Sequence, residues 1–270
     1  MNVTIETTAD GSPTLYREDL DEHYHSVKGA LSESLHVYVD CAWRKAAQAA
    51  EPNQAAQAAP VRIFEVGFGT GLNAALTARA ATAAGKPTEY FSVELHPLAA
   101  NETDLYARSL PEDLRDLFRA VNSAPWQHAT PITPDFTLTK IHSNLLTMSL
   151  PQAPDLPSPS TLPQDPDHSN QSTDTLPQNL DLPNPSTLPK NLDAIYFDAF
   201  APEKQPEMWS EALFRKLYNS MKPGAILTTY CAKGAIRRLL NQIGFLTERL
   251  PGPPAGKREI LRATKPTKFF

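Results

Sequence analysis

Two acidic side chains end short strand-like runs of this 270-residue chain: Glu94 ends the run 89–94, and Asp198 ends the run 192–198. A carboxylate at such a place can take both hydroxyl protons of a ribose, or hold an amine and accept its proton. Runs this short predict inner strands of a parallel sheet, and in open α/β sheets ligands bind at the carboxyl ends of the strands. We therefore predict a ribose-binding role for Glu94 and a catalytic role for Asp198.

A glycine-rich turn follows an earlier strand-like run, Val61–Val66, and opens a helix expected over 73–84. Alternate glycines permit a sharp turn and a close approach to a ligand, which the free N–H groups of the helix would face. The spacing E-x-G-x-G-x-G differs from the dinucleotide pattern G-x-G-x-x-G, and no Lys-Ser/Thr follows to form a P-loop. It resembles the first motif of Rossmann-like S-adenosylmethionine methyltransferases. That resemblance implies cofactor contacts for Glu65, Gly67, Gly69, Gly71 and Asn73.

The remaining core elements alternate between strands and helices. The strand-like run 136–142 is followed by Asn144, where many methyltransferases carry an acid bonded to the adenine amino group, and an amide oxygen can accept the same bond. The alternation predicts one doubly wound α/β domain, which the resemblance makes a Rossmann-like class I methyltransferase fold. The further elements expected are helices over 97–121, 210–221 and 236–244, a strand over 225–230, and an edge-strand hairpin including 256–261.

Composition divides the chain into three parts. Residues 1–59 contain an acidic stretch, followed by an alanine- and glutamine-rich segment at 44–59 that is expected to be helical. We predict that residues 1–59 form a cap or lid before the methyltransferase domain at 60–270. Residues 150–190 are rich in Pro, Ser, Asn, Gln and Asp and contain a single duplication, which predicts a disordered insert without a catalytic role. The candidate pocket residues of the cap are Tyr24, His25 and His36.

Bulk composition narrows the function classes. No apolar run is long enough for a membrane span, and residues 1–11 do not resemble a secretory signal. Cys41 and Cys231 lack metal-ligand spacing, so we expect free thiols, a cytoplasmic protein and no metal site. The net charge of −5 does not indicate a nucleic-acid binder, but residues 231–270 hold nine bases against two acids, and such a basic end can contact phosphates.

A longer motif identifies a family. The run D-A-F-A-P-E-K-Q-P-E-M-W over 198–209 resembles the methyltransferase domain of bacterial tRNA-modifying MnmC-type enzymes, which methylate the aminomethyl group on the wobble uridine of certain tRNAs. The chain departs from that family at Ala199, where a glycine is usual, at Asn144 and in the proline-rich insert. Further matches are Asp10-Gly11, Tyr24, Ser26, Gly29, Glu33, His36, Val37, Lys222-Pro223-Gly224, Arg237-Arg238, Gly244-Phe245 and Lys257-Arg258-Glu259.

The resemblance implies an S-adenosylmethionine-dependent N-methyltransferase that acts on the tRNA anticodon region. Asp198 would then orient the amine and take up the proton lost on methylation. No second glycine-rich nucleotide motif is present, so we expect a stand-alone methyltransferase, with an oxidase or other upstream tRNA-modifying enzyme as a separate protein. The residues expected to bind the substrate are Tyr24, Phe200, Pro202, Lys204, Arg237, Arg238, Lys257 and Arg258.

Two alternatives remain open from the sequence. A polyamine aminopropyltransferase has a related glycine loop, ribose acid and strand-end Asp, but it would not need a basic C-terminal face and would lack the long motif after Asp198. The second alternative is a degenerate Rossmann domain that binds RNA or a partner protein without catalysis. Calorimetric measurement of cofactor binding separates this last class from the two enzymes.

Overall fold

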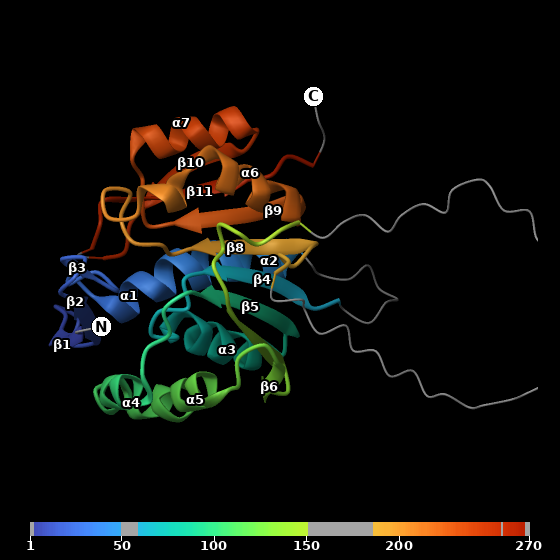
Figure 1. Ribbon diagram of the computed structural model, residues 1–270. Coiled ribbons are helices and arrows are strands. Elements are labelled where there is room, and N and C mark those ends of the chain that lie inside the picture. The colour runs from blue at the N-terminus through green and yellow to red at the C-terminus, as the bar shows by residue number, and fades with distance from the viewer. Residues whose placement is uncertain (1–2, 50–58, 151–185, 255, 268–270) are drawn as a thin grey trace, which may run out of the picture.

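The computed structural model describes residues 3–49, 59–150, 186–254 and 256–267. Its centre is a sheet of eight strands (Figure 1). The strands are β4 (Val61–Val66), β5 (Thr88–Glu94), β6 (Ala129–Thr133), β7 (Phe136–His142), β8 (Leu192–Phe197), β9 (Met221–Thr229), β10 (Leu246–Pro251) and β11 (Glu259–Thr264). Their order in the sheet is β10-β11-β9-β8-β4-β5-β7-β6.

The order in which the chain adds strands to the sheet reverses beside β4. From β4 the chain moves outward to β5 and β7, and it then returns to β8 on the other side of β4; all these neighbours are parallel, as are β8 and β9. Val66 is in register with Phe197, and the Asp198 N–H donates to the Val66 carbonyl at 3.2 Å. Where the strand order reverses, the connections that follow the two central strands leave a crevice between them. The carboxyl ends of β4 and β8 therefore border a binding site.

The inner strands are buried on both faces, which explains their continuous apolar runs. Ile63 and Tyr196 pack into one hydrophobic cluster, whereas their chain neighbours Phe64 and Phe197 pack into a second. All four side chains are completely buried. Side chains alternate across a strand, so helices must cover both sheet faces.

Helices supply those two covers. The first cluster includes residues of α3, α4 and α5, and the second includes residues of α6 and α7. Their bounds are α3 Leu72–Ala84, α4 Ala100–Arg108, α5 Glu112–Ser123, α6 Glu211–Ser220 and α7 Gly234–Ile243. Ser210 caps α6 by accepting the Leu213 N–H at 3.4 Å, and the left-handed residues Gly85 and Gly244 end α3 and α7. These starts and stops follow the sequence predictions.

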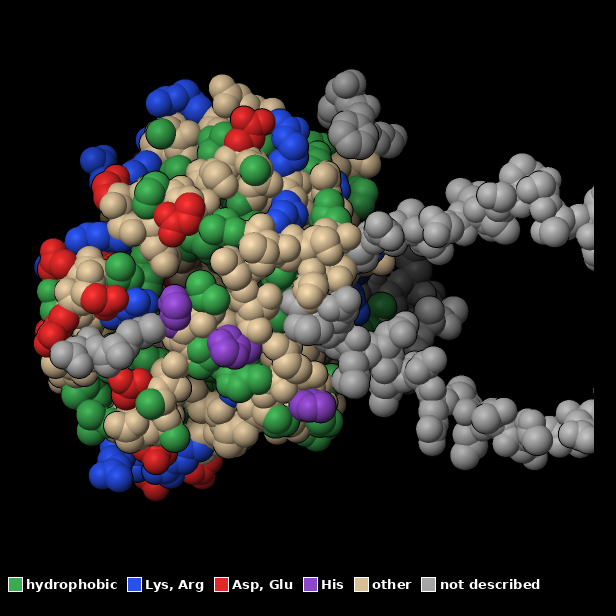
Figure 2. Space-filling model, viewed as in Figure 1, with side chains coloured by type: hydrophobic (Ala, Val, Ile, Leu, Met, Phe, Trp, Pro, Cys, Tyr) green, Lys and Arg blue, Asp and Glu red, His purple; other side chains and the backbone are tan. Residues whose placement is uncertain are grey.

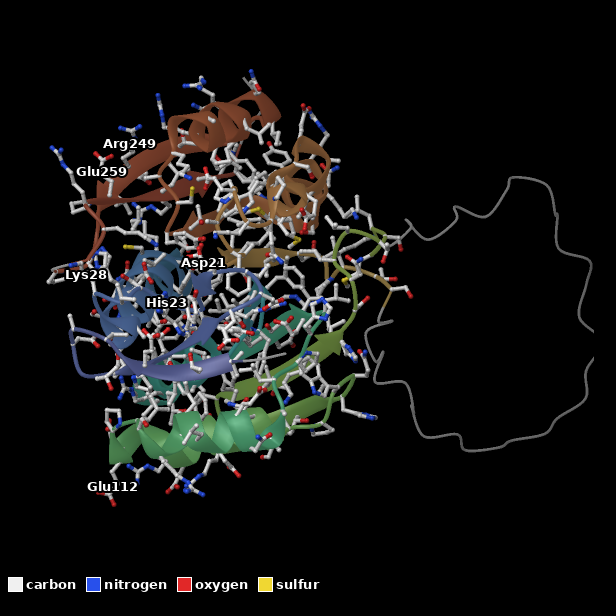
Figure 3. All side chains as sticks on the ribbon, turned by 60° about the vertical axis from the view of Figure 1, so that its left-hand side comes forward. Asp21, His23, Lys28, Glu112, Arg249 and Glu259 are labelled. Atoms are coloured by element: carbon white, nitrogen blue, oxygen red, sulfur yellow. The ribbon has the colours of Figure 1, made fainter. Side chains whose placement is uncertain are left out.

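The N-terminal part forms a small sheet and a helical segment beside the main sheet. Its elements are β1 (Val3–Thr7), β2 (Pro13–Arg17), β3 (Glu22–His23), α1 (Ala30–Ser34), the π-helix η1 (Leu35–Trp43) and α2 (Arg44–Ala49). The buried Tyr106 hydroxyl of α4 donates to the Pro13 carbonyl at 2.8 Å, which fastens the small sheet to the main body. Figure 3 shows Asp21 and His23 of this region below the C-terminal hairpin that carries Arg249 and Glu259.

Two elements differ in detail from the sequence predictions. The helix expected over 97–121 is two helices, because Pro111 has no N–H donor and its ring cannot lie inside a helix. The hairpin of β10 and β11 is present, but β11 pairs with β9 as well, so β10 is the edge strand.

The predicted insert is too long at its C-terminal end. Ser149 donates its N–H to Ser186, Leu188 donates to Ser149, and the Leu188 side chain is buried in the second cluster. Residues 151–185, and residues 50–58 of the predicted alanine-rich helix, lie outside the described residues. Within the described ranges, no helix has the length and apolar character needed to cross a bilayer.

Candidate functional site

A cavity of about 470 Å³ lies at the carboxyl ends of β4, β5, β7 and β8. This volume is in the range of small-molecule and cofactor sites. The predicted site residues that line it are Tyr24, Gly67, Gly69, Asn73, Glu94, Asn144, Asp198, Phe200 and Lys257. The predicted residues that lie outside its lining are Glu65, Gly71, Pro202, Lys204, Arg237, Arg238 and Arg258.

The glycine-rich turn forms the floor of the cavity. Gly67 has a φ of +88°, a left-handed conformation that favours glycine, and its N–H donates to the Val93 carbonyl at 3.1 Å. A Cβ at this position would lie 3.0 Å from the Asp198 carbonyl oxygen. The turn therefore needs glycine here both for its backbone shape and for the close approach of β8.

Glu94 faces the same floor from the end of β5. Its Oε2 accepts the Gly69 N–H at 3.1 Å, and its Oε1 accepts the His96 N–H at 2.8 Å. Each carboxylate oxygen has a second lone pair, so Glu94 can also accept hydrogen bonds from a bound ribose. The position supports the predicted ribose contact and shows that Glu94 also holds the turn.

Apolar side chains mark the end of the cavity next to β7. Leu95 and Leu146 line it and expose 45% and 37% of their surfaces, which is unusual for large apolar residues of this structure. Asn144 lies beside them, and its Oδ1 accepts the Leu146 N–H at 3.0 Å. The Asn144 oxygen thus has one lone pair left for an adenine amino group, while the leucines offer apolar contact to a ring.

Asp198 lies on the other side of the turn, and its carboxylate is held at both oxygens. Tyr38 of η1 donates to Oδ1 at 2.6 Å, and the Asn73 amide donates to Oδ2 at 2.8 Å. Burial raises the pKa of Asp198 to about 6, against the lowering effect of these two hydrogen bonds. The carboxylate is therefore charged above about pH 6 and has a fixed orientation.

Glu65 does not take the cofactor-binding position that the motif implied. Its side chain is completely buried in the sheet and accepts the Ser92 hydroxyl at 2.6 Å. Burial raises the pKa of Glu65 to about 8, so this carboxyl is mostly protonated at neutral pH. Gly71 also turns away from the cavity, because a Cβ there would meet the Phe68 ring.

Two aromatic rings form a wall of the cavity above Asp198. The Tyr24 ring meets the Phe200 ring edge to face, with centroids 5.3 Å apart, and Arg17 lies over the Phe200 ring. Trp209, which the long motif contains, is buried and donates to the Phe200 carbonyl at 2.8 Å. Trp209 therefore supports the wall from behind. His25 lines the cavity, whereas His36 instead contacts the Pro251 carbonyl at 2.8 Å.

The predicted basic contacts divide into two groups. Lys257 reaches into the cavity. Lys204 pairs with Asp21 at 3.4 Å and so joins the loop after β8 to the N-terminal sheet. The α7 residues Arg237 and Arg238, and Arg258, lie outside the cavity, and Arg238 and Arg258 are exposed. Figure 2 shows acidic side chains along the edge formed by β1–β3 and basic ones over α7 and β10.

Sequence reasoning missed three residues at this end of the cavity. Tyr38 contacts Asp198, and Glu33 and Tyr230 line the cavity. Tyr230 follows β9 directly, so the strand-end rule that identified Asp198 could have found it. Glu33 was among the family matches but was given no place in the pocket, and Tyr38 carried no signal, because their segment precedes the main sheet and reaches the cavity only through packing.

Comparisons with known proteins agree with this geometry. Residues 181–266 match the family described as S-adenosyl-L-methionine-dependent methyltransferase. The chain is 29% identical over 252 residues to the tRNA 5-methylaminomethyl-2-thiouridine biosynthesis bifunctional protein MnmC of Cupriavidus necator. This alignment covers 91% of this chain and 32% of that protein. The MnmC protein of Pseudomonas aeruginosa is 32% identical over 211 residues, 75% of this chain and 26% of that protein. The chain thus spans about a third or less of these curated relatives.

A solved structure shows the same fold. The crystal structure of MNMC2 from Aquifex aeolicus matches with a TM-score of 0.69 and 22% identity, over all of this chain and 73% of that one. The fold is the Rossmann-like fold of class I methyltransferases, and the family match covers the last third of the chain. In sequence, the chain is similar to part of the MnmC proteins.

The residues of the cavity fit the cofactor that this family uses. The turn brings its backbone to the cavity, and a Cβ at Gly67 would crowd the Asp198 carbonyl oxygen. Glu94 has free lone pairs, and Leu95 and Leu146 offer an apolar surface. In addition, Asn73 lines the cavity, and its amide donates to the Asp198 carboxylate at 2.8 Å. S-adenosylmethionine therefore has an acceptor, a backbone cradle and an apolar surface in this one cavity.

Proposed function

We propose that this protein transfers a methyl group from S-adenosylmethionine to the aminomethyl group on the wobble uridine of tRNA. The observation that carries the proposal is the Asp198 carboxylate, which lines the cavity directly beside the glycine-rich turn. The names of the MnmC relatives, which concern tRNA 5-methylaminomethyl-2-thiouridine biosynthesis, support the choice of substrate.

Asp198 has the properties needed to handle an amine. S-adenosylmethionine, when bound, supplies the methyl group on a sulfonium centre. An attacking amine must direct a neutral lone pair at that carbon, and we infer that Asp198 accepts a hydrogen bond from the amine and sets this direction. Tyr38 and Asn73 prevent the carboxylate from rotating away. Above its pKa of about 6, Asp198 can also take up the proton that the nitrogen loses.

The aromatic wall of Tyr24 and Phe200 suits an unstacked base, since sequence-specific RNA recognition relies on splayed bases that pack against aromatic rings. We infer phosphate contacts outside the cavity, where they would position the tRNA without reading its sequence. The candidates for these phosphate contacts are Lys204, Arg237, Arg238 and Arg258, whereas Pro202 is a candidate for contact with the base.

The aminomethyl group must be made before it is methylated. We infer that an oxidase or another tRNA-modifying enzyme supplies it, and that both reactions take place in the cytoplasm. In the described part of the chain, no cluster of three or more His, Cys, Asp and Glu side chains is arranged to bind a metal ion.

The test uses methyl-labelled S-adenosylmethionine and tRNA from cells that lack this methylation, followed by mass spectrometry of the wobble nucleoside. We expect one added methyl group on the aminomethyl uridine, and none with D198N. Cofactor binding without transfer to tRNA would contradict the proposal, and polyamines would then be tested as acceptors. Failure to bind the cofactor would contradict methyl transfer altogether.

A further inference from the structure

The cavity already contains a cation of its own, the ammonium group of Lys257. Its Nζ lies 3.6 Å from the centre of the Tyr230 ring and 3.1 Å from Glu33 Oε1. Lys257 comes from the loop between β10 and β11, whereas Glu33 belongs to α1 and Tyr230 follows β9. Three distant segments thus meet around one ammonium group.

The two partners of this ammonium are fixed in place. The Glu33 side chain is only 8% exposed, and its second oxygen accepts the Ser26 N–H at 2.8 Å. The Tyr230 hydroxyl donates to the Ala199 carbonyl at 2.9 Å, which holds the ring against the cavity. Lys257 itself is less constrained, because 40% of its side chain is exposed. The carboxylate and the ring are therefore a preformed site, and Lys257 is its movable occupant.

This site adjoins Asp198. Ala199, which anchors the Tyr230 ring, is the next residue in the chain, and the charges of Glu33 and Lys257 both act on Asp198. An aromatic face beside carboxylates is the arrangement that binds alkylammonium ions. A nearly buried carboxylate such as Glu33 is strongly destabilising while it is charged and unpaired, so the site favours a bound cation.

We propose that Glu33 and Tyr230 form an ammonium subsite, which Lys257 fills in the free protein and from which the alkylammonium group of the substrate displaces it. The identity of that alkylammonium as the tRNA aminomethyl group rests on the proposed function. The exchange replaces one ammonium by another, so the buried charge of the cavity stays constant while the substrate arrives beside Asp198. The bound ammonium then passes one proton to the Asp198 carboxylate, which frees the nitrogen lone pair for methyl transfer. Lys257 can move into solvent because its loop lies at the surface.

The subsite can be tested without tRNA. Binding of ethylammonium chloride is measured by NMR titration for the wild type, for K257M, and for the double variant E33Q/K257M. We expect K257M to bind ethylammonium at least about tenfold more tightly than the wild type, because the competing internal ammonium is gone. The double variant should lose this gain. A matched control is K28M, which removes an exposed lysine of the N-terminal segment, labelled in Figure 3, and should bind like the wild type.

Ethanol, which has nearly the same size as ethylammonium but no charge, should bind no better to K257M than to the wild type. Equal ethylammonium affinity of folded K257M and wild type would overturn the subsite, and K257Q replaces K257M if the latter does not fold. The proposed function fails independently: if K257M gains ethylammonium affinity but tRNA is not methylated, the subsite stands and serves another amine. If tRNA is methylated and no gain appears, only the subsite is wrong.

Discussion

The two ends of the cavity are built in different ways. The cofactor end consists of a turn and strand ends that follow β4, β5 and β7, each close to its own element in the sequence. The amine end combines Glu33, Tyr38, Asp198, Tyr230 and Lys257, which come from four separate segments. A local pattern can specify the first kind of site, whereas only packing of the whole chain assembles the second.

The two ends also differ in the groups that hold their carboxylates. At the cofactor end, backbone N–H groups hold Glu94, and exposed leucines lie next to it. At the amine end, burial shifts the pKa of Asp198, and buried side chains hold it. We therefore expect substitutions at the cofactor end to change affinity, and those at the amine end to change turnover and its pH dependence.

The largest effect is expected for D198N at the amine end. An amide cannot accept the proton that the methylated nitrogen loses, so kcat should fall by about 10²–10⁴-fold, the usual contribution of a proton-transfer group. S-adenosylmethionine affinity, measured by calorimetry, should change little. Near-normal turnover with intact cofactor binding would show that Asp198 is not catalytic.

The next effect is expected for E94Q at the cofactor end. Loss of the charged acceptor removes hydrogen bonds worth about 1.5–3 kcal/mol, so S-adenosylmethionine should bind roughly 10–100-fold more weakly. The control is E89Q, on the same strand but paired with Arg62 far from the cavity. If both variants bind the cofactor equally well, Glu94 does not contact it.

A smaller, pH-dependent effect is expected for Y38F. The Tyr38 hydroxyl stabilises the charged form of Asp198, so its removal should raise the Asp198 pKa above about 6. Turnover requires the charged form, whose fraction grows as pH rises through that pKa. The acid limb of the pH–rate profile should therefore move to higher pH, with roughly a tenfold loss near pH 6 and recovery near pH 9. Y106F, which also removes a buried tyrosine hydrogen bond, should leave this limb in place.

The smallest effect is expected for E65Q, and it concerns stability. The folded state raises the Glu65 pKa from 4.5 to about 8, so it keeps a proton that the unfolded chain has released. The contribution of Glu65 to the stability of the folded state is therefore fully present below about pH 4.5, and it is lost as pH rises through 8. Glutamine removes the loss, so the Tm of E65Q relative to wild type should rise by a few degrees between pH 5 and pH 9. A pH-independent difference in Tm would show that Glu65 is not protonated in the fold.

Much of the fold followed from the sequence because its signals are local. The apolar runs, the glycine stops and the Ser210 cap predicted most core elements, and the strand-end rule brought Glu94 and Asp198 to one cavity. The errors also have local causes. Pro111 divides a helix that the apolar pattern alone could not divide, and whether β11 lies inside the sheet depends on its pairing with β9.

The sequence by itself determined the class of the fold, the glycine-rich turn and the place of Glu94 at the end of β5, because each depends on a few consecutive residues and their backbone preferences. Tertiary structure alone decided that Glu65 is a buried, protonated support and that Tyr38 holds Asp198. It also decided that Lys257 lies between Glu33 and Tyr230. Burial and long-range contacts set these roles, and neither is encoded in the spacing of neighbouring residues.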